Sequence, residues 1–167
     1  MRKMNMSTVV IGLGNPVLTD DSVGFHAARE ISTRLRGRED VVVREICSGG
    51  LDLMEAMVGY ERAIVMDAAV TGRVDPGAVF TLRLSDLLRS RNTASVHNAS
   101  IEVAIELGML AGLALPRDIR FWAVEAEDVT TFNEQLTETV QRALPVLITN
   151  VLRDIDDGMV THPEKSL

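Results

Sequence analysis

The chain has 167 residues, enough for one domain with a single hydrophobic core. Hydrophobic residues make up 46% of it, as in ordinary globular proteins, and its formal net charge is -7. This acidity disfavours binding to nucleic acid or to an anionic membrane surface. The single cysteine, Cys47, excludes an internal disulfide and a cysteine metal cluster, which favours a reducing compartment. We expect Cys47 itself to be a small buried residue.

The N-terminal residues resemble neither a secretion signal nor a membrane span. Residues 1–7 are polar, and the apolar run that follows them is short and interrupted by Gly12 and Gly14. We therefore expect a cytoplasmic monomer that binds no nucleic acid and no membrane.

The first half of the chain alternates predicted strands and helices. An apolar run at residues 8–13, ended by glycine, predicts a strand that is buried on both faces. Apolar residues at helical spacing predict a helix over 22–35, and a valine-rich segment predicts a second strand over 41–47. A short helix after Gly50 and a central strand over 63–70 follow.

The second half of the chain continues this alternation. A turn sequence at residues 75–77 precedes a predicted edge strand over 78–84. After a polar loop, apolar periodicity predicts a helix over 98–113, then a strand over 119–124 and a long helix over 133–152.

Strands that alternate with helices in this way predict an α/β fold. We expect three layers, with a mostly parallel, twisted sheet of about five strands covered by helices on both faces. Residues 1–154 are expected to form one domain. Residues 155–167 have little to bury and are expected to form a mobile tail.

Three candidate ligands for a metal ion fall at one edge of the predicted sheet. In such folds, ligands bind beyond the carboxyl ends of the strands. Asp21 follows the first strand, Asp67 lies near the end of the third, and His97 precedes a helix. Two carboxylates and one imidazole suit a divalent transition ion with open coordination positions.

Each of these residues also has a structural explanation. Asp20, Asp21 or Ser22 could cap the following helix, and an acid in its first turn would stabilise its N-terminus. Asp67 lies in an apolar strand, where a carboxylate must be paired, hydrogen-bonded or bound to a cation. His97 could cap a helix or be a solvated loop residue. The spacing alone leaves these alternatives open.

The glycine turn at residues 12–17 invites comparison with a dinucleotide-binding loop. It lacks the third glycine of that motif, and Pro16 occupies the turn where a helix should open. The acids at positions 20 and 21 would also repel a pyrophosphate. The hypothesis that the chain is a nucleotide-binding α/β protein therefore rests only on the predicted fold and the glycine turn. Thermal stabilisation by nucleotides, with none by nickel, would favour it.

Three separated motifs together resemble those of the hydrogenase maturation endopeptidases. The motifs are Gly12-x-Gly14-Asn15 with Asp20-Asp21 and Gly24, then Asp67-Ala68 at the end of an apolar strand, then Ser95-Val96-His97 before a helix. The resemblance extends from Thr8 to Leu152 and includes the order of the motifs.

This resemblance implies a hydrolase that removes a C-terminal extension from the large-subunit precursor of a nickel–iron hydrogenase after nickel insertion. It implies that Asp21, Asp67 and His97 form the catalytic site and bind nickel, which the precursor carries. Another divalent ion could replace nickel in crystals. The resemblance does not identify the general base, for which Asp20, Asp21 and Asp67 all stay open. A non-catalytic chaperone that senses nickel on the precursor would need the same ligands.

One loop departs from the pattern of the family. Many members have Asp-Gly-Gly-Thr after the second strand, in a loop linked to substrate recognition, whereas this chain has Ser48-Gly49-Gly50-Leu51. The retained Gly49 and Gly50 permit close approach of a peptide backbone, so we expect them in a substrate-binding loop. The missing acid and hydroxyl leave the type of hydrogenase large subunit open.

Overall fold

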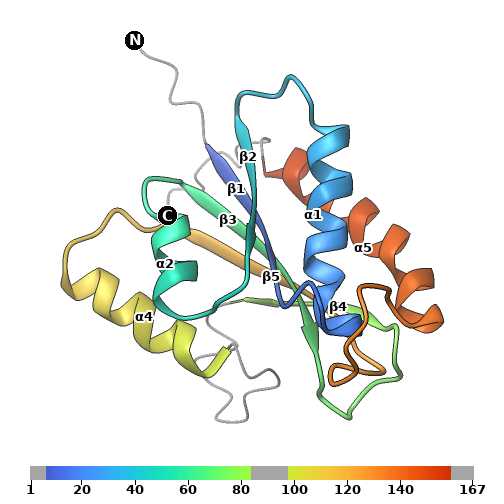
Figure 1. The fold of residues 1–167 in the computed structure, drawn as a ribbon. Coiled ribbons are helices and arrows are strands. Elements are labelled where there is room, and N and C mark those ends of the chain that lie inside the picture. Colours follow the sequence, from blue (N-terminus) through green and yellow to red (C-terminus); the bar gives the residue numbers. More distant parts are fainter. Residues whose placement is uncertain (1–6, 84–97, 159–167) are drawn as a thin grey trace, which may run out of the picture.

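The structure of the protein is a computed structural model that describes residues 7–83 and 98–158. In these residues, a five-stranded sheet forms the middle layer and helices cover both of its faces (Figure 1). The strands are β1 (Thr8–Leu13), β2 (Val41–Ile46), β3 (Arg62–Ala69), β4 (Val79–Arg83) and β5 (Asp118–Glu125). The helices are the 3-10 turn η1 (Thr19–Ser22) and the α-helices α1 (Val23–Arg34), α2 (Leu51–Met57), α4 (Asn98–Leu110) and α5 (Glu138–Asp157).

The strand order is β2-β1-β3-β5-β4, and every neighbouring pair is parallel except β5 and β4. Every residue of β1 and β3 is buried, because both strands are inside the sheet and have helices on both faces. This explains why their sequences are mostly apolar. The predicted three-layer α/β class and the predicted edge position of β4 are both confirmed.

Alternation along the central strands divides the core into two halves. Val10 and Ile64 belong to a cluster with residues of α1 and α5, whereas Val9 and Val65 belong to one with residues of α2 and α4. Successive side chains of a strand point to opposite faces, so each strand contributes to both halves. Figure 1 shows the two helix pairs on either side of the sheet. Within the described residues, no helix is both long and apolar enough to cross a membrane.

The final helix begins and ends later in the chain than the predicted range 133–152. α5 begins at Glu138, with Thr137 as its N-cap, and continues to Asp157. Ile155 is buried against the core, so the domain boundary expected after residue 154 falls inside this helix. Residues 159–167, the rest of the expected tail, lie outside the described residues.

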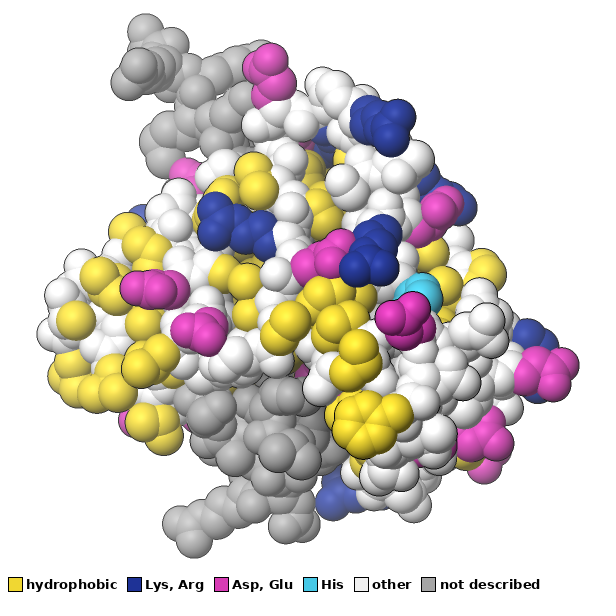
Figure 2. Space-filling view, in the orientation of Figure 1, with side chains coloured by type: hydrophobic (Ala, Val, Ile, Leu, Met, Phe, Trp, Pro, Cys, Tyr) yellow, Lys and Arg dark blue, Asp and Glu magenta, His cyan; other side chains and the backbone are white. Residues whose placement is uncertain are grey.

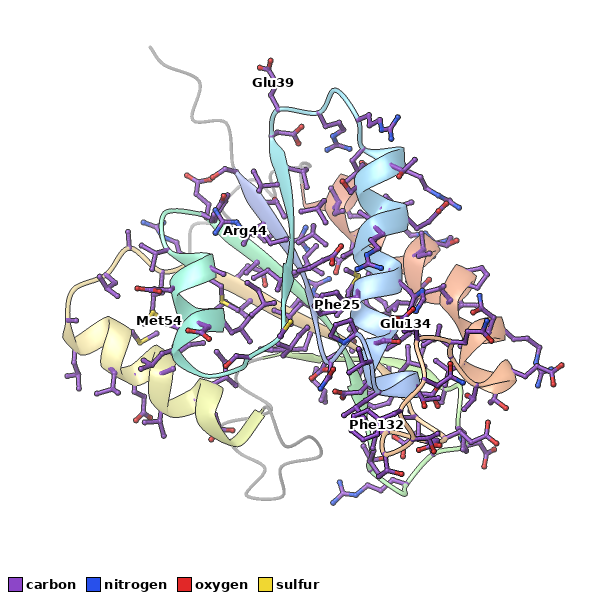
Figure 3. The ribbon with its side chains drawn as sticks, in the orientation of Figure 1. Phe25, Glu39, Arg44, Met54, Phe132 and Glu134 are labelled. Atoms are coloured by element: carbon purple, nitrogen blue, oxygen red, sulfur yellow. The ribbon has the colours of Figure 1, made fainter. Side chains whose placement is uncertain are left out.

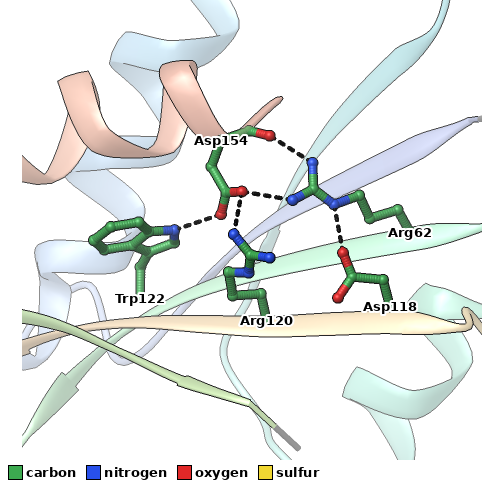
Figure 4. A network of polar contacts seen from close by, with 5 residues as sticks. All are labelled: Arg62, Asp118, Arg120, Trp122 and Asp154. Carbon is green, nitrogen blue, oxygen red and sulfur yellow. Dashed lines mark hydrogen bonds and ion pairs between the residues drawn. The ribbon is translucent and has the colours of Figure 1, made fainter. Parts of the chain in front are cut away.

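A buried polar network fixes the C-terminal part of α5 to the sheet (Figure 4). The carboxylate of Asp154 accepts hydrogen bonds from Arg62, Arg120 and Trp122. Arg62 also donates to Asp118 at 2.9 Å. Since Arg62 and Asp118 are the first residues of β3 and β5, this network lies at the amino ends of the strands, opposite the predicted site.

Candidate active site at the carboxyl edge of the sheet

The turn after β1 brings Asp21 back over the end of its own strand. Gly14 has a φ of 142°, which glycine adopts readily, and a Cβ there would overlap the carbonyl oxygen of Asp21. The amide of Asn15 donates to this carbonyl oxygen at 3.2 Å and to Oδ2 of Asp21 at 3.0 Å. The carboxylate of Asp21 is thereby held, partly exposed, at the carboxyl end of β1.

The start of α1 packs directly against the strands without intervening side chains. A Cβ on Gly12 would overlap the carbonyl of Gly24, and a Cβ on Gly24 would overlap the carbonyl of Met66 in β3. Glycine at both positions is therefore required by the close approach of α1 to the strands. Because Met66 precedes Asp67, this contact places the turn that carries Asp21 beside the end of β3.

Asp67 lies near the carboxyl end of β3 and is 5% exposed. Its Oδ1 accepts a hydrogen bond from the amide of Ala68 at 2.8 Å. In strand alternation Asp67 has the same parity as Ala63 and Val65, which pack with α2 and α4. The carboxylate therefore faces the side of the sheet that α2 and α4 cover.

His97 lies outside the described residues, immediately before Asn98, the first residue of α4. Figure 1 shows the start of α4 and the carboxyl end of β3 at the same edge of the sheet. The described ranges contain no group of three His, Cys, Asp or Glu side chains arranged to hold a metal ion. The structure thus places Asp21 in the turn after β1 and Asp67 near the end of the neighbouring strand β3, and the three-residue metal site stays a prediction.

Asp20 has a role that sequence reasoning missed. It is fully buried, and its carboxylate accepts hydrogen bonds from the amides of Glu127, Asp128 and Thr137 at 2.8–3.0 Å. The hydroxyl of Thr137 donates to it as well. Asp20 therefore does not cap α1, one of the roles we had considered, but fastens the loop between β5 and α5. These partners lie more than a hundred positions away in the chain, and no local pattern marks them.

The expected substrate loop, with Gly49 and Gly50, lies beside the Asp21 turn. The amide of Gly14 donates to the carbonyl of Ile46 at 3.2 Å, which joins the turn to the end of β2. Gly50 is the N-cap of α2 and has a φ of 62°, so the position favours glycine. Cys47 is exposed, not buried as expected, because it follows the last residue of an edge strand.

The amino-acid sequence also matches that of a known protein family. The model for the hydrogenase maturation proteases, HycI, matches residues 25–154. The chain belongs to the hydrogenase maturation protease family. It is also 23% identical over 164 residues to the hydrogenase 2 maturation protease of Escherichia coli strain K12, covering 97% of this chain and 99% of that protein.

Solved structures of the family have the same fold. The hydrogenase maturating endopeptidase HybD of Escherichia coli superposes with a TM-score of 0.80 at 23% identity, covering 92% of this chain and 94% of that chain. The [NiFe] hydrogenase maturation protease HybD of Thermococcus kodakarensis has a TM-score of 0.70 at 18% identity, covering 89% and 98%. The resemblance inferred from the three motifs is confirmed, and family membership makes the protein a hydrolase, an endopeptidase of hydrogenase maturation.

Proposed function

We propose that the protein removes a C-terminal extension from the large-subunit precursor of a nickel–iron hydrogenase after nickel has been inserted. The named relatives act in hydrogenase maturation, and one of them is named for a [NiFe] hydrogenase. The observation that carries the proposal is the close contact of Gly24 with the Met66 carbonyl. It sets the turn with Asp21 against the strand position that precedes Asp67.

Asp21, Asp67 and His97 bind the nickel that the precursor carries. Carboxylate oxygens and an imidazole nitrogen are suitable donors for such an ion and leave coordination positions open. A carboxylate as deeply buried as that of Asp67 favours a cation nearby, and the partial exposure of Asp21 leaves the edge accessible to a protein substrate. An ion held by these three residues would polarise the carbonyl of the scissile peptide bond.

The surroundings of Asp20 make it a poor general base. Its oxygens accept hydrogen bonds from three amides and one hydroxyl, and no part of the residue is exposed. A general base must reach a water molecule at hydrogen-bond distance, and these donors already surround the carboxylate. Asp21 and Asp67 are therefore the carboxylates that we propose as proton acceptors.

The mass of the large subunit tests this function. A catalytic amount of the protein should shorten an excess of nickel-loaded precursor and leave nickel-free precursor intact. Asp67→Ala and His97→Ala should abolish processing, whereas Asp157→Ala, which removes an exposed carboxylate at the far end of α5, should not. Processing at the wild-type rate by both site variants would contradict the assignment. A nickel-sensing chaperone would instead bind the precursor one to one and leave its mass unchanged.

A further inference from the structure

The loop after β5 exposes a large apolar side chain beside the turn that carries Asp21. Phe132 is 83% exposed, and Val17 in the turn is 42% exposed. Leu18 forms isolated β-bridges with Phe132 and Asn133, so the two segments lie side by side. Figure 3 shows Phe132 at the outer end of the loop, and Figure 2 shows apolar side chains on the same part of the surface.

Hydrogen bonds from the Asp21 turn hold this loop in place. The amide of Thr19 donates to Asn133 O at 2.8 Å, and its Oγ1 donates to Thr131 O at 2.6 Å. The amide of Asn133 donates to Val17 O, and the amide of Asp20 donates to Asp128 O, both at 3.0 Å. The buried carboxylate of Asp20 adds its bonds to the two ends of the same loop. Phe132 is therefore presented at a fixed position relative to Asp21.

The backbone of the turn is strained where it meets the loop. Thr19 has a φ of 28°, in a region that β-branched residues rarely adopt. Its amide and its hydroxyl both donate to the loop, and these bonds keep the residue in this conformation. Strain of this kind persists where surrounding contacts over-determine a segment, and it is common at ligand-binding sites.

The joined segments carry only negative formal charge. Residues 12–28 and 121–141 contain seven Asp or Glu residues and no Lys or Arg. Arg29, which follows the first of these segments, interacts electrostatically with Glu134, whereas Glu127 lies nearer the start of the loop. Asp20 and Glu125 are buried and bonded internally, whereas Glu127 and Glu134 are exposed on the same loop as Phe132. Figure 3 shows Glu134 and Phe132 on this loop. An apolar anchor in acidic surroundings is complementary to an apolar group with positive neighbours.

We propose that Phe132 and Val17 form a docking contact for the hydrogenase precursor and receive an apolar side chain that is flanked by Lys or Arg. This inference rests on the proposed function. An aromatic side chain on a loop that is already ordered loses little conformational freedom on binding, and such residues often dominate interface energies. The contact positions the precursor on the edge of the sheet where Asp21 and Asp67 lie.

Processing kinetics with nickel-loaded precursor test the anchor. Phe132→Ala should raise KM for the precursor about tenfold and leave kcat within about twofold, because the ring binds without touching the reacting atoms. Phe132→Leu should restore most of the lost affinity. The matched control is Leu110→Ala on α4, where an 85% exposed side chain is removed far from the loop. Equal KM values for Phe132→Ala and Leu110→Ala would overturn the inference.

Two further measurements separate this contact from its alternatives. The Glu127→Gln, Glu134→Gln double variant should have a lower kcat/KM than wild type at low ionic strength. Its kcat/KM should also depend less on salt concentration. An unchanged salt dependence would contradict the proposal that Lys or Arg flanks the apolar side chain of the precursor. Sedimentation should show that wild type and Phe132→Ala have the same mass. A dimer that Phe132→Ala dissociates would assign the surface to a second copy instead. If wild type leaves the nickel-loaded precursor intact, the proposed function fails before this contact is tested.

Discussion

Asp20 and Thr137 lie 117 positions apart in the chain, and their side chains and backbone meet in the interior. The amide of Thr137 donates to Oδ1 of Asp20 at 2.8 Å, and its hydroxyl donates to the same carboxylate. Thr137 is also the N-cap of α5 and accepts from the amide of Val140. One buried carboxylate therefore joins the turn that carries Asp21 to the start of the last helix.

Asp20→Ala should lower the free energy of unfolding by about 3 kcal/mol or more. The change removes the acceptor of three part-buried amides and one hydroxyl, and each donor left unsatisfied in such surroundings costs about 1–3 kcal/mol. Chemical denaturation measures the loss, with the exposed Asp157→Ala as control. A difference between the two variants of under about 0.5 kcal/mol would mean that Asp20 does not fasten the loop.

Gly24→Ala should destabilise the protein by about 3 kcal/mol or more, although alanine favours a helix over glycine by about 1 kcal/mol. The added Cβ would overlap backbone carbonyls of β1 and β3, which are central strands and cannot move easily. Gly112→Ala is the matched control, because its Cβ would meet nothing and only its φ of 72° opposes the change. Melting temperatures compare the two, and equal losses would show that the close contact at Gly24 is unimportant.

Asp154→Ala should cost about 3–5 kcal/mol, because it leaves the guanidinium of Arg62 buried without this partner. Asp156→Ala, two positions along the same helix, removes an exposed ion pair with Arg38 and should cost at most about 1 kcal/mol. The network lies at the opposite edge from the candidate site. At a low temperature at which the Asp154→Ala variant stays folded, it should therefore process precursor at close to the wild-type rate. A large loss of kcat under these conditions would mean that the network affects the candidate site.

The loop that carries Phe132 should resist acid. Hydrogen bonds from Thr131 and Thr130 hold the pKa of Asp128 well below its usual range. The pKa of Asp128 is lower in the folded protein than in the unfolded chain, where it is about 3.9. The ionised carboxylate therefore stabilises the folded loop at any pH above the unfolded pKa, and this stabilisation is lost as the pH falls through the folded pKa.

Hydrogen exchange at the amides of Thr130 and Thr131 measures this effect. Protection should be constant from about pH 8 to about pH 5 and decline only in stronger acid, after correction for intrinsic exchange. Asp128→Asn should reduce protection already at neutral pH, since the ionised acceptor is gone. A decline of the wild-type protection between about pH 7 and pH 5 would assign it to another titrating group.

The succession of elements could be predicted from local sequence for a physical reason. A strand that helices cover on both faces is largely apolar, so β1 and β3 stand out as nearly continuous apolar runs. A carboxylate inside such a run is costly, which marked Asp67 before its position was known. The structure explains why the motif has glycine at positions 14 and 24, because the conformation of Gly14 and the close contact of Gly24 both depend on the absence of a side chain.

The function of Asp20 and the start of α5 depend on contacts between distant segments. Asp20 and Asp21 are adjacent identical residues, and no local pattern distinguishes the buried clamp from the partly exposed candidate ligand. Residues 133–137 were predicted as helix, but the structure uses Asn133 and Thr137 in bonds to the turn after β1. Side-chain and backbone hydrogen bonds across more than a hundred positions override local helix propensity, which amounts to only a few tenths of a kcal/mol per residue.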